Sequence, residues 1–131
     1  MRSRILFVSG CRDDARLLSQ MLHSLPLALD HVRTVQQARA KLRQFGYEVI
    51  LTEAVLPDGN WLDVLHDVRR HPAAMEVIVT DPHADARFWS EALNLGAYDL
   101  VSQPFYEPEV RRILYNACSR TSQQRVPMTV A

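Results

Sequence analysis

The hydrophobic pattern along the chain alternates between two kinds of segment. Short apolar runs have the length and composition of buried strands, and the segments between them repeat apolar residues at helical spacing. We expect strands at residues 5–8, 27–32, 49–51, 77–79 and 100–101. We expect helices at residues 13–23, 35–45, 60–71 and 84–95, and from 108 to 117.

Residues typical of helix ends support these boundaries. Asn60 can cap the third helix, which His71 and Pro72 would end, and Gly96 is a natural left-handed terminator for the fourth. Strands that alternate with helices through short connections form a parallel sheet with right-handed crossovers. The pattern therefore predicts an α/β fold, a flavodoxin-like three-layer (βα)5 sandwich around a five-stranded parallel sheet.

The length and composition indicate one domain. With 131 residues, of which 47% are hydrophobic, the chain can bury a core of its own. We expect this domain to occupy residues 1–118. The apolar period is lost after that point, so residues 119–131 are interpreted as a flexible C-terminal tail or linker stub.

The charge balance limits the classes of partner. Fifteen basic and fifteen acidic residues cancel, so no overall field attracts nucleic acid or an anionic membrane. No apolar stretch has the length of a membrane span, and we expect a cytoplasmic protein without a direct nucleic-acid or membrane partner. Cys11, Cys118 and the five histidines match no metal-ligand spacing, so no metal site is expected.

In a sheet of this kind, ligands bind beyond the carboxyl ends of the strands. The polar or small residues expected there follow the first, third, fourth and fifth strands: Ser9, Gly10, Cys11, Glu53, Thr80, Asp81, Ser102 and Gln103.

Three motifs give this edge of the sheet a family resemblance. They are Glu53 followed by Leu56-Pro57-Asp58-Gly59, then Gly96-Ala97-Tyr98-Asp99, and then Gln103-Pro104-Phe105. In order and spacing, residues 4–118 resemble the receiver domain of response regulators in two-component phosphorelay signalling. The resemblance implies receiver topology and a role in a bacterial two-component or related pathway.

The family's chemistry requires an acidic pair for magnesium, an acceptor aspartate, a hydroxyl and a lysine, and this chain departs from nearly every one of these requirements. Ser9 and Gly10 stand at the acidic pair, or Gly10 and Cys11 if the register shifts by one. Glu53 holds the phosphoacceptor-equivalent position and Gln103 the lysine position.

Two further positions of the resemblance differ as well. The hydroxyl position falls on Asp81 by an ungapped count from Gly96, and on Thr80 after a shift of one. Leu100 replaces the switch aromatic. The nearest acids, Asp13 and Asp14, are interpreted as helix N-terminal residues that favour the macrodipole.

These residues predict a degenerate pocket without catalytic residues or a cofactor. Mg²⁺ binding is expected to be weak or absent because the acidic pair is missing. Glu53 is interpreted as a non-acceptor, since in-line phosphoryl transfer tolerates little misplacement. We expect Thr80, Gln103 and backbone amides to supply hydrogen-bond partners for its carboxylate.

The main hypothesis is an atypical receiver, a pseudo-receiver, that is not an enzyme and acts through protein–protein interaction without aspartyl phosphorylation. One alternative is a conventional phosphorelay receiver with Glu53 or Asp58 as the acceptor. Others are the detached regulatory domain of a longer DNA- or RNA-binding regulator and a cofactor-binding enzyme on the same architecture. For the last, the segment from Ser9 to Arg12 is too short a phosphate cradle.

The expected partner is a signalling protein, or a second copy of the chain bound through the fourth helix, fifth strand and fifth helix, as the family does. The candidate interface residues on this face are Phe88, Asp99, Arg111, Arg112 and Tyr115, with Trp89 adding aromatic area. The competing interpretation is a solvated charged face with Trp89 in the core. Trp61, near the pocket rim, is expected to pack against its neighbouring loop.

Overall fold

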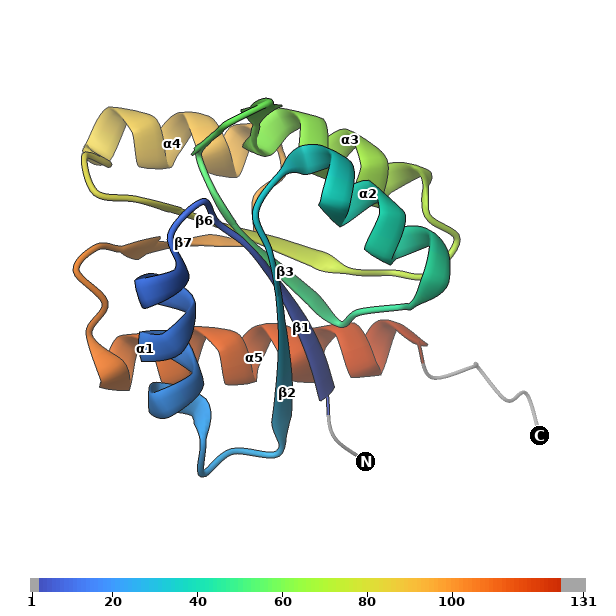
Figure 1. Cartoon of the computed structure of the whole chain (residues 1–131), viewed down its shortest axis with the longest axis horizontal. Helices are drawn as coiled ribbons and strands as arrows, with labels where there is room; N and C mark the ends of the chain where they lie inside the picture. The colour runs from blue at the N-terminus through green and yellow to red at the C-terminus, as the bar shows by residue number, and fades with distance from the viewer. Residues whose placement is uncertain (1–2, 126–131) are drawn as a thin grey trace.

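The computed structural model describes residues 3–125, which form a single five-stranded parallel sheet covered by helices on both faces (Figure 1). The strand order is β2-β1-β3-β6-β7. The strands are β1 (Ser3–Val8), β2 (Leu27–Val32), β3 (Val49–Glu53), β6 (Glu76–Asp81) and β7 (Asp99–Ser102). Order and direction confirm the flavodoxin-like sandwich expected from the sequence.

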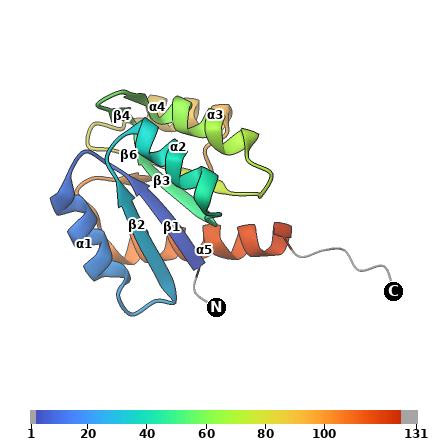
Figure 2. The ribbon, with the colours of Figure 1, turned by 45° about the vertical axis from the view of Figure 1, so that its right-hand side comes forward.

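The helices divide between the two faces of the sheet, as the two views show (Figures 1 and 2). One face carries α1 (Arg12–Leu22) and α5 (Glu107–Arg125). The other carries α2 (Val35–Gln44), α3 (Trp61–Arg70) and α4 (Ala86–Leu95). A short antiparallel hairpin, β4 (Val55–Leu56) and β5 (Gly59–Asn60), follows β3 and was not expected from the sequence.

Alternation along the strands produces two hydrophobic cores. In β1, Ile5 and Phe7 face α1 and α5, whereas Leu6 and Val8 face the three other helices. All four side chains are fully buried. Burial of each such side chain stabilises the fold by about 1.5–3 kcal/mol. Strands buried on both faces therefore consist mainly of apolar residues, and this is why they can be recognised in the sequence.

Two helix ends form as expected. Asn60 accepts from the backbone amides of Leu62 and Asp63, and the Asp63 carboxylate accepts from the Asn60 amide in a reciprocal capping box. Gly96 ends α4 at a φ of 118°, where a Cβ atom would be strained and would collide with the Arg69 guanidinium.

The last helix is longer than expected. It continues to Arg125, so residues 119–125 are helical and the boundary expected at residue 118 falls inside α5. Thr121 is fully buried, with its Oγ1 2.8 Å from the Glu48 carbonyl oxygen. Arg125 donates to the carbonyl oxygens of Tyr47 and Ala74. The tail expected at residues 126–131 lies outside the described residues.

Within residues 3–125, no helix is both long and apolar enough to cross a membrane.

Candidate functional site

The carboxyl ends of the central strands bring the expected pocket residues together. Val8 at the end of β1 pairs with Thr52 in β3, and Glu53 pairs with Thr80 in β6. Asp81 in turn pairs with Ser102, which precedes Gln103. Because these strands are parallel, the residues at their ends share one edge of the sheet.

Ser9 is the hydrogen-bond partner of Glu53. The Ser9 hydroxyl, which is fully buried, donates to Oε1 of Glu53 and accepts from the backbone amide of Cys11 at 3.0 Å. His31 in β2 donates through Nε2 to the Ser9 carbonyl oxygen at 2.8 Å, which steadies the same segment. The neutral Ser9 hydroxyl thus binds the Glu53 carboxylate.

The surroundings of Glu53 raise the pKa of its carboxyl group above the ordinary value. Partial burial is the largest cause, and the hydrogen bond from Ser9 opposes it. The charges of Asp14 and Asp81 raise the pKa further, while His31 lowers it. The pocket therefore gathers acidic groups around a half-buried carboxylate, and no group of three or more potential metal ligands occurs within residues 3–125.

Two expected partners of Glu53 bind elsewhere, so that part of the prediction is wrong. Thr80 donates its hydroxyl to the Val101 carbonyl oxygen at 2.8 Å, because β6 places the two residues side by side. Gln103 donates through Nε2 to Oδ2 of Asp14 at 3.1 Å. Each of these donors is already used by a neighbour other than Glu53.

Sequence reasoning missed two residues of this pocket. Asp14 was interpreted as a helix N-terminal residue alone, yet it bonds Gln103 and its charge acts on Glu53. His31 was overlooked because it lies in an edge strand. Only the position of Asp14, soon after the end of β1, could have signalled its place in the pocket.

The other residues that the sequence placed in or near the pocket have different surroundings. Asp81 accepts a hydrogen bond from the His83 backbone amide at 2.8 Å. Of the two residues Thr80 and Asp81, it is Asp81 whose negative charge raises the pKa of Glu53. Gly10 is half-buried, and a Cβ atom there would make an ordinary 3.9 Å contact with Pro57. Leu100 is 3% exposed and packs in the core beneath α3 and α4.

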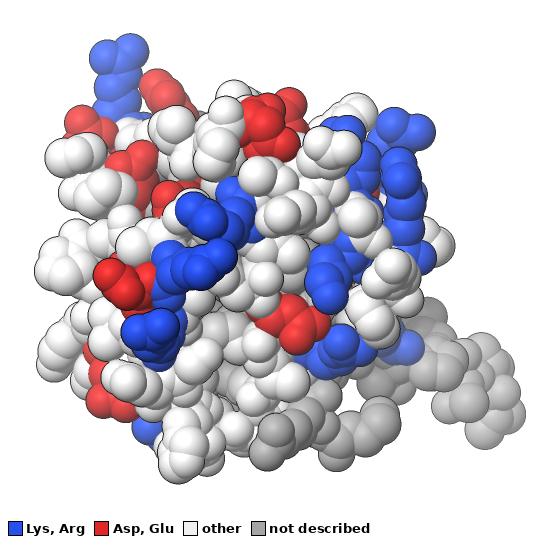
Figure 3. Space-filling model, in the orientation of Figure 1, with Lys and Arg blue, Asp and Glu red and all other residues white. Residues whose placement is uncertain are grey.

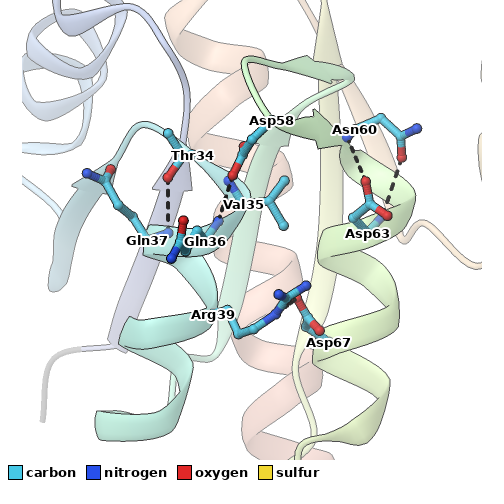
Figure 4. Close-up of polar contacts among 9 residues, drawn as sticks. All are labelled: Thr34, Val35, Gln36, Gln37, Arg39, Asp58, Asn60, Asp63 and Asp67. Atoms are coloured by element: carbon cyan, nitrogen blue, oxygen red, sulfur yellow. Dashed lines mark hydrogen bonds and ion pairs between the residues drawn. The ribbon is translucent and has the colours of Figure 1, made fainter.

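Asp58 stabilises the start of α2 (Figure 4). Its Oδ1 accepts from the Val35 amide at 2.7 Å and its Oδ2 from the Gln36 amide at 3.1 Å. These hydrogen bonds hold the pKa of Asp58 below its ordinary value, and the bond from the Val35 amide has the largest effect. Both oxygens are engaged at a helix N-terminus, which disfavours Asp58 as an alternative acceptor.

The tryptophans take opposite positions. Trp61 is 5% exposed and packs as expected, but Trp89 is 42% exposed, so the interpretation that placed Trp89 in the core is wrong. The side of α4 that packs on the core carries Phe88 and Ala92, which are one helical turn apart. Residue 89 lies off this side of the helix, so its side chain faces outward.

The other candidate interface residues differ in how far they are engaged within the chain. Asp99 accepts the Leu100 amide at 2.7 Å, and Arg111 pairs with Glu107 at 3.7 Å. Arg112 and Tyr115 are exposed. Cys11 is exposed, Cys118 is buried, and both are free thiols.

Comparison with known proteins assigns this architecture to a family. The family model described as the response regulator receiver domain matches residues 5–115. Response regulator protein PilR of Pseudomonas aeruginosa is 28% identical over 117 residues, which cover 88% of this chain and 26% of PilR. The chain spans about a quarter to less than half the length of the first curated relatives it matches.

Solved structures share the fold. The signal receiver domain of an HD domain-containing protein from Pseudomonas fluorescens Pf-5 superposes with a TM-score of 0.84 at 23% identity, covering 94% of this chain and 99% of that one. The receiver domain of sensor histidine kinase PA1611 from P. aeruginosa PAO1, which has a magnesium ion in its active-site cleft, gives 0.79 at 22% identity, covering 91% and 99%. Because its model match covers most of the chain, this protein belongs to the response regulator receiver domain family.

Proposed function

We propose that this chain is a pseudo-receiver, a signalling module that acts through protein–protein interaction without an aspartyl-phosphate cycle and is not an enzyme. One observation carries the proposal: the Ser9 hydroxyl binds the Glu53 carboxylate at the place where an acidic pair would coordinate magnesium. The neutral serine hydroxyl donates a hydrogen bond there, in the place of a hard, anionic metal ligand.

The electrostatics of the pocket support the same conclusion. Phosphoryl transfer depends on a metal ion and a cationic side chain to stabilise the charge of the transferred group. Here Gln103 is neutral and bonded to Asp14, and Asp81 adds a negative charge near Glu53. An incoming phosphoryl group would therefore meet carboxylates and no lysine.

A conventional receiver with Glu53 as the acceptor is less well supported. Attack by Glu53 would require its oxygen to leave the Ser9 hydroxyl, and the extra methylene of glutamate moves that oxygen away from the place an aspartate oxygen would take. Burial and the charges of Asp14 and Asp81 also raise the pKa of Glu53, which disfavours the charged, nucleophilic form of the carboxylate.

The proposal is tested by an amide-resolved NMR titration of the protein with Mg²⁺ and beryllofluoride, an analogue of an acyl phosphate. We expect no saturable shifts at Glu53, Asp81 or Gln103. The matched control restores the family's residues at all five positions: Ser9→Asp, Gly10→Asp, Glu53→Asp, Asp81→Thr and Gln103→Lys. The open contact at Gly10 leaves room for the added carboxylate.

Shifts in the restored variant alone would support the pseudo-receiver. Saturable shifts in the natural protein that spread from the pocket to Leu100 and α4 would contradict it and restore the phosphorelay hypothesis.

A further inference from the structure

Two adjoining clefts run along the seam between α2 and α3, on the face of the sheet opposite α1 and α5. The larger, of about 730 Å³, lies at the C-terminal ends of the two helices, around Arg43, Arg70 and Pro72. The smaller, of about 430 Å³, reaches the helix starts at Asp58 and Asp63. Arg39 and Arg43 line both clefts, so the two clefts adjoin, and together they are called the groove.

The groove is held in shape by contacts between the helices. Arg39 in α2 forms an ion pair with Asp67 in α3 at 3.0 Å, across the middle of the seam (Figure 4). His71, after α3, donates through Nε2 to the Leu42 carbonyl oxygen of α2 at 3.1 Å, while its Nδ1 accepts from the Ala73 amide. A preformed groove lowers the entropic cost of binding a ligand.

The two ends of the groove carry opposite charge. Arg43 and Arg70 are exposed, and neither has an ion-pair or hydrogen-bond partner among residues 3–125. Blue atoms gather in this region of the surface, towards the ends of α2 and α3 (Figure 3). Asp67 is already paired with Arg39, so the positive charge at this end is not neutralised locally.

Two carboxylates, those of Asp58 and Asp63, lie at the opposite end of the groove, in a cleft that Arg39 and Arg43 also line. The carboxylates of Asp58 and Asp63 accept hydrogen bonds from the backbone amides of Val35, Gln36 and Asn60, and neither carboxylate forms an ion pair within residues 3–125. The same polar contacts fix them in place at the helix starts (Figure 4).

We propose that this groove binds a peptide segment of a partner protein, with acidic residues of that segment against Arg43 and Arg70 and a basic residue against Asp58 and Asp63. The bipolar charge distinguishes this occupant from a nucleic acid, whose phosphates would face the two carboxylates along the same groove. Pro72, which is exposed at the basic end, offers apolar contact there. The inference rests on the proposed function to the extent that a pseudo-receiver requires a surface for its partner.

The test uses the full chain at low salt and two fluorescently labelled peptides with glutamates in one half and lysines in the other, in opposite orders. We expect at least one peptide to bind with a dissociation constant below about 1 mM, with NMR shifts confined to residues of the groove. Arg43→Gln with Arg70→Gln should weaken binding about tenfold. Arg12→Gln with Arg16→Gln, an equal charge change at exposed positions of α1, should leave binding unchanged.

Three outcomes would overturn the inference. One is the absence of groove shifts with either peptide. Another is equal or stronger binding of a single-stranded RNA oligonucleotide at the same residues. The third is self-association of the chain that depends on Arg43 and Arg70, since a second copy would then occupy the groove. Because no phosphodonor is present, these outcomes are independent of the beryllofluoride titration.

Discussion

Glu53 combines a strand-end position with surroundings that disfavour its charge. It is half-buried, bonded by the Ser9 hydroxyl and faced by the charges of Asp14 and Asp81. Desolvation and like charges both favour the protonated form of a carboxyl group. Ionisation of Glu53 in the folded state therefore costs stability, and this cost can be measured.

Glu53→Gln is expected to raise the free energy of unfolding at pH 7 by about 1 kcal/mol or less, a value discounted for partial solvation. The folded-state pKa of Glu53 is raised above its ordinary value, so between the unfolded and the folded pKa the native state holds a proton that the unfolded chain has lost. Stability then falls as pH rises from about the unfolded pKa through the folded one, and glutamine, which can still accept from Ser9, removes that slope.

Urea denaturation between pH 4 and pH 8 checks the Glu53→Gln prediction, with Asp13→Asn, which removes a carboxylate at an exposed position of α1, as the control. The same pH slope in natural protein and Glu53→Gln variant would contradict a raised pKa.

The last turns of α5 show how an element is extended by tertiary contacts. Thr121 places its hydroxyl within 2.8 Å of the Glu48 carbonyl oxygen and 3.0 Å of the Ala117 carbonyl oxygen. Arg125 reaches the Tyr47 carbonyl oxygen at 2.6 Å. These bonds join the end of the helix to the segment that enters β3.

Thr121→Val is expected to lower the free energy of unfolding by about 1 kcal/mol, because it removes a buried hydrogen bond while keeping the side-chain volume. Chemical denaturation measures the loss, and Ser122→Ala at an exposed neighbouring position is the control. Equal stability of the two variants would show that the buried hydroxyl of Thr121 contributes nothing to the fold.

The start of α2 depends on a side chain from the β4–β5 turn. Asp58→Ala should lower the melting temperature by a few degrees and speed amide exchange at Val35 and Gln36, whose amides lose their acceptor. Asp58→Asn, which keeps one acceptor oxygen, should have a smaller effect. Because the pKa of Asp58 is lowered, its carboxylate stabilises the fold above the unfolded pKa, and this stabilisation is lost as pH falls through the folded pKa. At low pH the variants and the natural protein should therefore have similar stability.

At the scale of the whole molecule, the face of α4, β7 and α5 remains the expected surface for a homodimer. Trp89, Tyr115 and Arg112 are exposed on these helices, and Asp99 lies half-buried in β7. We propose that Asp99 and Arg112 pair between two copies, since receivers use such positions for ion pairs between subunits.

Asp99→Arg is expected to weaken dimerisation about tenfold or more, because like charges would then face each other. Adding Arg112→Asp should restore it, and Asp13→Arg on α1 is the charge-matched control. Sedimentation of the natural protein and these variants measures the association constant. A natural protein that stays monomeric at about 0.1 mM would remove the basis for this dimer.

The sequence by itself determined the fold and the location of the candidate site. The central strands β1, β3 and β6 are nearly continuous apolar runs because they are buried on both faces, and amphipathic helices alternate with the strands. Glu53 and Gln103 follow such strands, so their place at the carboxyl edge could be predicted from local pattern alone. The helix caps at Asn60 and Gly96 could also be predicted from the sequence, since each depends on a few neighbouring residues.

Only the tertiary structure decided which polar groups meet. Ser9 and Glu53 are 44 positions apart in the sequence, and Asp14 and Gln103 are 89 apart. Which of several nearby donors forms a hydrogen bond with a given acceptor depends on small differences in the distance between them. The outward turn of Trp89 and the extension of α5 to Arg125 likewise depend on contacts with other elements. Burial of apolar surface repeats along the chain and leaves a periodic pattern, whereas a hydrogen bond between distant residues leaves none.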